Sequence, residues 1–425
     1  MFKKKKTVIT SIDLGNSKIS VMVAEMNDDE DDTISIIEHF EKPTQHSLER
    51  GIIKKPELLA SILDDITETL EKKIKEYSYE ELFKNMIFGV SAPAPLMKFL
   101  EGEGIVRSNE KNSIVTPEVM RNAVNNAGRG IPNDYEELVS INKTYKLNDN
   151  YIINPEGLSY SKLKAIIIQT IIDTNVYEDI RRLTSRYVYN EEDVSIIFNG
   201  NATIAGVEKN ILDKTILVID MGAELTDVAY YHLGSPVYYD VIPIGCEHLE
   251  NDLQLGLDIM ESKAKHILGD DKYWANYEDE YISIKDSNKT ILKQIPLYSV
   301  ELIIETRIKE LCDFIKDTLQ KNGLNYHDKN CQIRFTGGGA KYKFILGLLK
   351  ENFDFANIAI GVPDITGATT GIEDPRYSTG YGLLLRKKDM VLEDRSKQQN
   401  ILTTFINKLK DLFSSGDAGI KNSIG

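Results

Sequence analysis

Asp13-Leu14-Gly15-Asn16-Ser17-Lys18 is the stretch that decides the fold, because a second stretch further along the chain repeats its pattern. The second stretch reads Asp220-Met221-Gly222-Ala223-Glu224-Leu225-Thr226. In both, an aspartate ends a strand-like run, a glycine follows two residues later, and a turn leads into another strand-like run. We therefore predict two β-hairpins in an internally duplicated, bilobal α/β protein.

The first hairpin carries the groups that a phosphate-binding turn requires. Gly15 allows backbone N–H groups to approach an anion. The carboxylate of Asp13 suits a Mg²⁺ ion that keeps its waters, and Lys18 supplies positive charge for phosphate oxygens. A polar β-turn without a ligand would have the same residues, so one hairpin leaves both interpretations open. The second hairpin offers a comparable set: Asp220, Gly222 and Thr226.

A third element makes nucleotide binding the more specific interpretation. Thr336-Gly337-Gly338-Gly339-Ala340 follows a strand-like run, and consecutive glycines let the backbone lie against a nucleotide. Helical signals elsewhere support the α/β class: Pro56 begins one predicted helix, and Thr116-Pro117-Glu118 combines a capping residue with a proline at a helix start. Further helices are predicted over 176–189, 247–268 and 300–321.

The composition excludes several classes of protein. The 425 residues are 41% hydrophobic and 28% charged, as in a folded chain. The net charge of −15 disfavours nucleic acid as a partner, because phosphate contacts need clustered Lys and Arg. The three cysteines have no CxxC spacing, so we expect buried thiols and a reducing, cytosolic compartment. No apolar run reaches the ~20 residues of a membrane-spanning helix.

The order of the three elements resembles the actin-like ATPase superfamily. The resemblance implies that the hairpins are its phosphate-1 and phosphate-2 motifs, that 336–340 is its adenosine motif, and that Glu261–Gly269 closes over the nucleoside. It also implies ATP and Mg²⁺ as ligands, with the metal at Asp13 and Asp220. The implied nucleotide-binding residues are Asp13, Gly15, Asn16, Ser17, Lys18, Asp220, Gly222, Thr226, Lys265, Gly337, Gly338 and Gly339.

Within that superfamily the chain resembles the bacterial cell-division family FtsA. Four stretches carry this resemblance: 154–159 (NPEGLS), 198–202 (FNGNA), 361–367 (GVPDITG) and 374–384 (DPRYSTGYGLL). It implies an FtsA-type subdomain 1C at 85–173. The remaining implied boundaries are 1–84 and 174–212 for subdomain 1A, 213–255 and 326–375 for 2A, 256–325 for 2B, 376–390 for a closing helix, 391–399 for a linker and 400–413 for a membrane helix.

The second hairpin departs from the family pattern. The family usually has Asp-x-Gly-Gly-Gly-Thr, whereas this chain has Ala223, Glu224 and Leu225 after its first glycine. A Cβ at Ala223 narrows the approach to phosphate, and Glu224 brings negative charge near an anion. We predict that nucleotide still binds but that hydrolysis is slow or absent.

The segment 400–413 has the pattern of an amphipathic helix. Its apolar side chains fall on one arc: Ile401, Leu402, Phe405, Ile406, Leu409, Leu412 and Phe413. Such a helix is too short to cross a bilayer, so it docks on the protein or lies in the membrane interface. A charged segment over 386–399 reads as a linker, and together with the resemblance it favours the membrane.

The resemblance further implies partners and a location. FtsA proteins polymerise, bind FtsZ through subdomain 2B, work with other division proteins and sit at the septum on the cytoplasmic face of the membrane. The loosely aligned FtsZ contacts are Glu305, Arg307 and Glu310, although a charged helical face is more often only solvated. Two alternatives remain open: a PilM-like pilus-assembly protein, which lacks the tail helix, and a small-molecule kinase, whose general base we could not locate.

Overall fold

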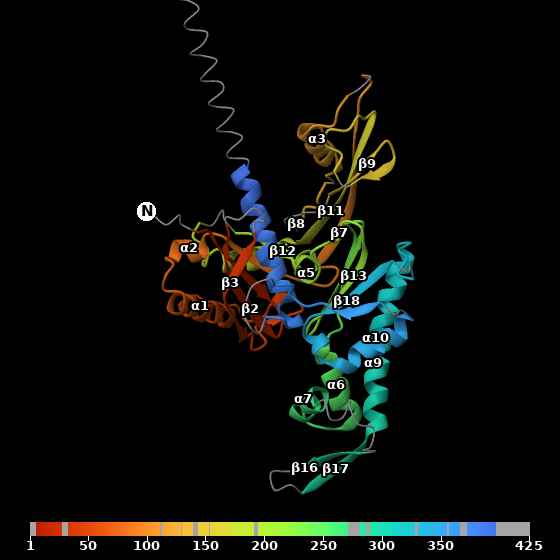
Figure 1. The fold of residues 1–425 in the computed structure, drawn as a ribbon. Helices are drawn as coiled ribbons and strands as arrows, with labels where there is room; N and C mark the ends of the chain where they lie inside the picture. The colour runs from red at the N-terminus through yellow and green to blue at the C-terminus, as the bar shows by residue number, and fades with distance from the viewer. Residues whose placement is uncertain are drawn as a thin grey trace, which may run out of the picture.

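The computed structural model describes residues 6–27, 33–110, 113–128, 130–138, 143–152, 154–190, 194–270, 281–285, 290–327, 330–354, 357–365 and 372–396. The fold is built on two five-stranded sheets, one in each half of the molecule (Figure 1). The first sheet has the order β12-β6-β1-β2-β3. Its strands are β1 (Val8–Leu14), β2 (Lys18–Met26), β3 (Ile34–Pro43), β6 (Met86–Val90) and β12 (Ile196–Phe198).

The second sheet repeats the first. Its order is β15-β14-β13-β18-β19, and β13 pairs antiparallel with β14 and parallel with β18, just as β1 pairs with β2 and β6. The strands are β13 (Thr215–Met221), β14 (Thr226–His232), β15 (Ser235–Ile242), β18 (Cys331–Thr336) and β19 (Ile358–Ile360). The predicted internal duplication is therefore confirmed.

The two hairpins also match in register. Asp13 lies opposite Ser20 and Leu14 opposite Ile19, while Asp220 lies opposite Asp227 and Met221 opposite Thr226. The turns between the last pairs thus have the same length. It follows that residues 15–18 correspond one by one to residues 222–225.

Helices cover the first sheet where the sequence predicts them. Helix α1 (Pro56–Lys73) begins at the expected proline, and its apolar residues at helical spacing are buried: Leu59, Ile62, Leu63, Ile66 and Leu70. The short helix α2 (Tyr79–Phe83) begins with a capping box formed by Ser78 and Glu81. Helix α4 (Thr174–Thr184) ends earlier than predicted, and turns follow it up to residue 190.

An arm inserted into the first half projects at the top of Figure 1. It contains β7 (Met97–Arg107), β8 (Tyr135–Glu137), β9 (Lys143–Leu147), β10 (Asn150–Ile152), β11 (Lys162–Asp173) and α3 (Pro117–Ala127). The predicted cap is confirmed, because the side chain of Thr116 accepts a hydrogen bond from the Val119 backbone N–H. Helix α3 packs closely on β7: a Cβ at Gly102 would lie 2.0 Å from the Ala127 carbonyl oxygen.

The helices of the second half are α6 (Cys246–Leu257), α7 (Glu261–Gly269), α9 (Leu297–Lys321) and α10 (Lys343–Phe353), with the hairpin β16 (Tyr281–Lys285) and β17 (Ile291–Pro296) beyond them. The single helix predicted over 247–268 is wrong, because the structure has two helices there. Asp258 adopts a left-handed conformation with φ 48°, which ends α6 and separates it from α7. Helix α9 buries Val300, Ile304 and Ile308 and lies beside α6 and α10.

The prediction of a linker over 386–399 is wrong for residues 386–396, which are helical. A helix runs without a break from 378 to 396, and it buries Lys387 and packs Val391 and Leu392 on the core. It crosses α5 (Asn199–Val207) at glycines, since a Cβ at Gly206 would lie 2.0 Å from the Ser378 carbonyl oxygen. The predicted amphipathic helix at 400–413 lies outside the described residues. Among the helices that are described, none is long and apolar enough to cross a membrane.

Candidate functional site

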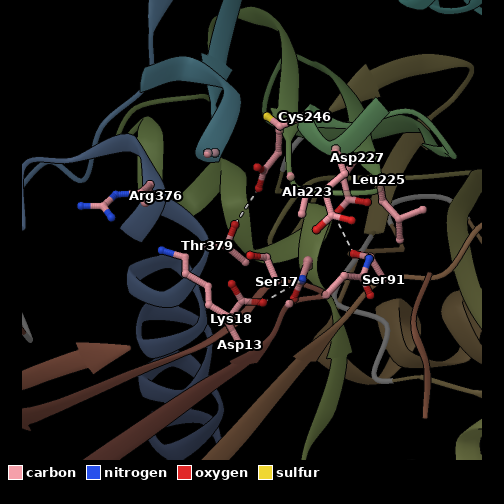
Figure 2. A pocket seen from close by; sticks show the side chains of 18 of the residues that line it. Asp13, Ser17, Lys18, Ser91, Ala223, Leu225, Asp227, Cys246, Arg376 and Thr379 are labelled. Carbon is pink, nitrogen blue, oxygen red and sulfur yellow. Dashed lines mark hydrogen bonds between the residues drawn. The ribbon is translucent and has the colours of Figure 1, made fainter. Parts of the chain in front are cut away.

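A cavity of about 340 Å³ lies between the two halves, and both hairpins line it (Figure 2). Asp13 and Asp220 are the next-to-last residues of β1 and β13, so the duplicated strands bring two equivalent carboxyl groups to one cavity. Gly15, Asn16, Ser17, Lys18 and Gly222 also line it, as the sequence predicts.

In the first hairpin, polar contacts from distant segments hold the side chains. Asn199 at the start of α5 donates a hydrogen bond of 3.0 Å to the Asp13 carboxylate. The Lys18 ammonium is paired with Glu41 and lies 5.3 Å from the ring centroid of Tyr377. The turn itself needs its glycine, because a Cβ at Gly15 would lie 2.7 Å from the Lys18 carbonyl oxygen.

Asp220 lies where the two connecting helices meet. Thr203 of α5 and Thr379 of the 378–396 helix donate hydrogen bonds of 3.2 and 2.7 Å to its Oδ2. These two hydroxyl groups are also 2.9 Å apart. The Asp220 carboxylate is thereby held by α5 and by the 378–396 helix, the two helices that connect the halves.

Asp227 is a third carboxyl group of the cavity. Ser91 donates a hydrogen bond of 2.6 Å to its Oδ2, and the dashed line in Figure 2 marks this contact. Its Oδ1 is buried without a hydrogen-bond partner. Sequence reasoning left Asp227 out of the site. The repeat gave no signal for it, because the matching position in the first hairpin is Ser20.

The acids of the cavity resist ionisation. Burial raises the pKa of Asp13 to about 7, the Asp220 carboxylate adds to this, and the Asn199 amide opposes it. Burial also raises the pKa of Asp220, and it raises that of Asp227 well above its usual value with a contribution from Asp220. Burial lowers the pKa of Lys18, against the attraction of Glu41. A cation in the cavity would stabilise the charged carboxylates.

The carboxyl groups fit a hydrated metal ion better than a directly bound one. In the part of the chain that the structure describes, no three His, Cys, Asp or Glu side chains lie close enough together to hold a metal. Mg²⁺ commonly keeps several waters and meets protein carboxylates through them. Asp13 and Asp220 could hold such an ion, as the sequence predicts.

The other end of the cavity is built by α6, α7 and the glycine turn. Lys265 lines it, 2.6 Å from Glu261 and 3.6 Å from Glu250. Of these two acids only Glu250 lines the cavity, together with its neighbour Glu247. Burial raises the pKa of Glu250, and Lys265 opposes the shift. The sequence did not predict Glu250, which lies on α6 and not on α7.

The glycine turn needs glycine at position 337 because the backbone there lies very close to Asp220. Gly337 has φ 82°, and a Cβ there would lie 2.2 Å from Asp220 Oδ1. Gly337 and Gly338 line the cavity. Gly339 instead packs on the Met221 side chain, where a Cβ would lie 2.7 Å from the sulfur. Gly339 is therefore not among the residues that line the cavity.

Thr226 is also placed away from the cavity wall. Its hydroxyl is fully buried and donates a hydrogen bond of 2.6 Å to the Ile244 carbonyl oxygen. Residues that line the cavity without having been predicted are Ser91, Asn199, Cys246, Lys341, Tyr342, Arg376 and Thr379. Burial raises the pKa of the Cys246 thiol to about 12, which agrees with the predicted unreactive, buried cysteine.

The altered turn does not bring a charge to the cavity. Ala223 and Leu225 line it, but the Glu224 carboxylate accepts a hydrogen bond of 2.6 Å from the backbone N–H of Arg50. The expectation that Glu224 opposes an anion held only if its side chain pointed inward. Its carboxylate is bound outside the cavity wall.

The predicted FtsZ contacts lie on α9 and do not line this cavity. Arg307 donates hydrogen bonds of 2.6 and 2.8 Å to the two carboxylate oxygens of Asp252 on α6, and it is also paired with Glu310. Glu305 is exposed. The guanidinium of Arg307 thus joins α9 to α6 within the chain.

Two sheets of the same strand order, facing each other across a cavity that both hairpins line, define an actin-like protein. The solved structure of the PilM–PilN type IV pilus biogenesis complex has this fold: it aligns with a TM-score of 0.56 at 14% identity, over 89% of this chain and 98% of that one.

Sequence comparison narrows the class. Residues 217–382 match the family model described as "Cell division protein FtsA". The chain is 25% identical to the FtsA of Borreliella burgdorferi over 95% of its own length and 96% of that protein. It is 24% identical to the FtsA of Bacillus subtilis over 88% of its own length and 82% of that protein. The predicted resemblance is confirmed, since the chain is similar to FtsA cell division proteins over most of its length.

Proposed function

We propose that this chain is an ATP-binding, actin-like scaffold that tethers FtsZ filaments to the cytoplasmic membrane during bacterial division. The observation that carries ATP binding is the convergence of both hairpins and the Gly337 turn on one cavity. FtsA relatives along nearly the whole chain support the role in division.

In this proposal each part of the cavity meets a different part of ATP. Backbone N–H groups of the two turns and the Lys18 ammonium face the phosphates, and Lys18 exchanges Glu41 for a phosphate oxygen. Asp13 and Asp220 hold the waters of Mg²⁺, which neutralises phosphate charge when bound. Gly337, Gly338 and the Lys265–Glu250 pair face the nucleoside.

The cavity favours binding over turnover. A base for water would have to be an ionised carboxylate, yet the pKa of Asp227 is raised well above its usual value by burial and by Asp220. Leu225 occupies the position that corresponds to Lys18 and offers no polar group to the phosphates. We therefore expect ATP to act as a structural ligand whose hydrolysis is slow.

Calorimetry with Mg²⁺ and ATP tests the first part. We expect saturable binding by the wild-type chain and a large loss of affinity in Asp220→Ala, because that change removes a metal-organising carboxylate. Lys72→Ala, on the exposed surface of α1, is the matched control and should bind as the wild type does. No heat at millimolar ATP would refute the site, and turnover at the rate of a sugar kinase would refute the slow hydrolysis.

The tethering part rests on two segments, the tail 400–413 and helix α9. The tail 400–413 provides an apolar arc for the membrane interface. On α9, exposed Tyr298 and Leu302 lie within three turns of Arg307 and offer an apolar surface to an FtsZ tail. Self-association into filaments would multiply such weak contacts.

Co-sedimentation with anionic vesicles tests this part. The full chain should pellet with vesicles and carry FtsZ into the pellet. A chain truncated after Gln399 should neither pellet with the vesicles nor carry FtsZ with it. Ile406→Glu should release the protein, and Thr404→Glu on the polar side of the same segment is the control. Vesicle binding by the truncated chain would show that the tail is not the tether.

A pilus-assembly scaffold is the second candidate, because the solved PilM–PilN complex shares the fold. The same pull-down separates the two roles. Retention of FtsZ on vesicles supports division, and retention of the cytoplasmic segment of a pilus protein without FtsZ supports the alternative.

A further inference from the structure

The segment Thr44–Gly51, called the strap here, crosses from the first half of the molecule to the second. It follows β3 and includes β4 (Leu48–Glu49), which pairs with β5 (Ile52–Ile53). Its backbone is unusual, with positive φ at Gln45, His46, Arg50 and Gly51. Non-glycine residues adopt such angles rarely and only where surrounding contacts hold them.

Three hydrogen bonds hold the strap on the first hairpin. The Thr44 backbone N–H donates to the Ser17 carbonyl oxygen over 3.0 Å, and the Thr44 hydroxyl donates to the carbonyl oxygen of Asn16. The Gly51 backbone N–H donates to the Asn16 side-chain oxygen over 3.1 Å. Both ends of the strap are thereby fixed to the turn that faces the phosphates.

One hydrogen bond reaches the second hairpin. The Glu224 carboxylate accepts from the Arg50 backbone N–H over 2.6 Å, which is short for a nitrogen donor and typical of a charged acceptor. Glu224 corresponds to Ser17 in the first turn. A glycine at position 224, which the family pattern has, would offer no acceptor to the strap.

The strap also contacts a residue of the cavity wall. A Cβ at Gly51 would lie 2.1 Å from the carbonyl oxygen of Ser91, which lines the cavity, and the Ser91 hydroxyl donates to Asp227. Contacts to both hairpins and to Ser91 thus converge on one short segment.

We propose that the strap closes the nucleotide cavity and that Glu224 is its latch, a positioning residue that joins the two hairpins through Arg50. Separation of the halves requires the Glu224–Arg50 hydrogen bond to break, so the latch favours the closed form and slows ligand release. The effect on ATP release rests on the proposed function, because it requires that ATP binds in the cavity. The latch itself does not depend on ATP, because its hydrogen bond joins two parts of the chain.

The experiment uses the full chain with Glu224→Gln, Glu224→Gly and the control Glu49→Gln. Glu49 is an exposed acid on the strap whose partner is Lys54, so the control removes a charge beside Arg50 without touching the latch. Amide hydrogen exchange at Arg50 and Gly51 is measured without nucleotide. Dissociation of a fluorescent ATP analogue is measured by chase with unlabelled ATP.

Loss of one charge-assisted hydrogen bond predicts that exchange at Arg50 and release of the analogue both become about tenfold faster in Glu224→Gly. Glu224→Gln should lie between, and Glu49→Gln should match the wild type. Unchanged exchange at Arg50 in Glu224→Gly overturns the latch, whatever the nucleotide does. Faster exchange without any analogue binding leaves the latch intact and refutes the proposed ATP site instead.

Discussion

The first and second hairpins have the same backbone and different side chains. Residues 15–18 and 222–225 occupy turns of equal length in matching registers, and each turn begins with a glycine. In the first, the polar groups of Asn16 hold the strap and Lys18 lines the cavity. In the second, Glu224 turns to the strap and Leu225 is buried with 6% exposure.

This difference shows what a duplicated fold keeps and what it lets change. The backbone turn is kept, because it positions an aspartate and a glycine in each half. The side chains have diverged: one copy brings the charge of Lys18 to the cavity, and the other offers an apolar wall and a contact between the halves.

The largest effect concerns the paired aspartates and pH. The folded pKa of Asp13 is about 7 and the ordinary value is 3.8, so the folded state holds its proton more tightly than the unfolded chain. Stability from this group is full below pH 4 and is lost as pH rises towards 7, by up to about 4 kcal/mol. Asp13→Asn should therefore be more stable than the wild type at pH 8, with little difference at pH 4.

Urea unfolding of the ligand-free chain at both pH values measures this. Asp220→Asn is the matched variant and should remove less of the pH dependence, because Thr203 and Thr379 stabilise the Asp220 carboxylate. Equal effects of the two variants would show that the two aspartates have equivalent electrostatic environments, which would contradict the difference between the halves.

The next effect is on ligand binding. Lys18→Leu gives the first turn the residue of the second, and we expect ATP affinity to fall by about 2 kcal/mol, roughly 30-fold, through loss of a charged contact. Stability should change little, because the Lys18–Glu41 pair is partly exposed. Calorimetry with Lys72→Leu as control measures the affinity. Unchanged binding would mean that the first turn does not face the phosphates.

The matched glycines should differ in a graded way. A Cβ at Gly15 would lie 2.7 Å from the Lys18 carbonyl oxygen, and one at Gly222 would lie 3.1 Å from the Leu225 carbonyl oxygen. Gly15→Ala should cost about 2 kcal/mol of unfolding free energy and Gly222→Ala less than about 1 kcal/mol. Gly347→Ala, in α10 with nothing near its Cβ, should be neutral or stabilising. The reverse order of the first two costs would contradict the geometry.

Local patterns predicted much of the fold. The repeat of Asp-x-Gly between strand-like runs predicted the duplicated sheets, and Pro56 and Thr116 marked their helices, because caps and prolines act on adjacent residues. A closing helix was predicted over 376–390, but its continuation to 396 was missed, since the charged residues there read as a linker. Its apolar contacts are to β-strands far away in the sequence.

The candidate site was predicted where the turn residues themselves line the cavity. It was not predicted where the partners come from distant segments, as with Asn199 on Asp13 and Ser91 on Asp227. Thr226 and Gly339 were assigned from motif position, but Thr226 is buried with its hydroxyl bonded to Ile244, and Gly339 packs on Met221. A one-dimensional pattern specifies that a turn forms, and the rest depends on which elements pack against it.

The smallest effect tests whether the lost glycines of the second turn matter. Glu224 and Ala223 lie outside the positive-φ residues, and Ala223 already accepts a hydrogen bond of 2.8 Å from the Glu247 backbone N–H. The turn therefore adopts its conformation without glycine. Ala223→Gly should lower the unfolding free energy by about 0.5 kcal/mol, through greater freedom of the unfolded chain, and should leave ATP affinity within about twofold.

Thermal unfolding, calorimetry and ATP turnover on this variant decide the point. If turnover stays slow, the Cβ of Ala223 does not limit hydrolysis, and the cause lies with the buried Asp227, whose pKa is raised, and with Leu225. If turnover rises sharply, the methyl group of Ala223 crowds the phosphates, and the slow hydrolysis is a steric effect rather than an electrostatic one.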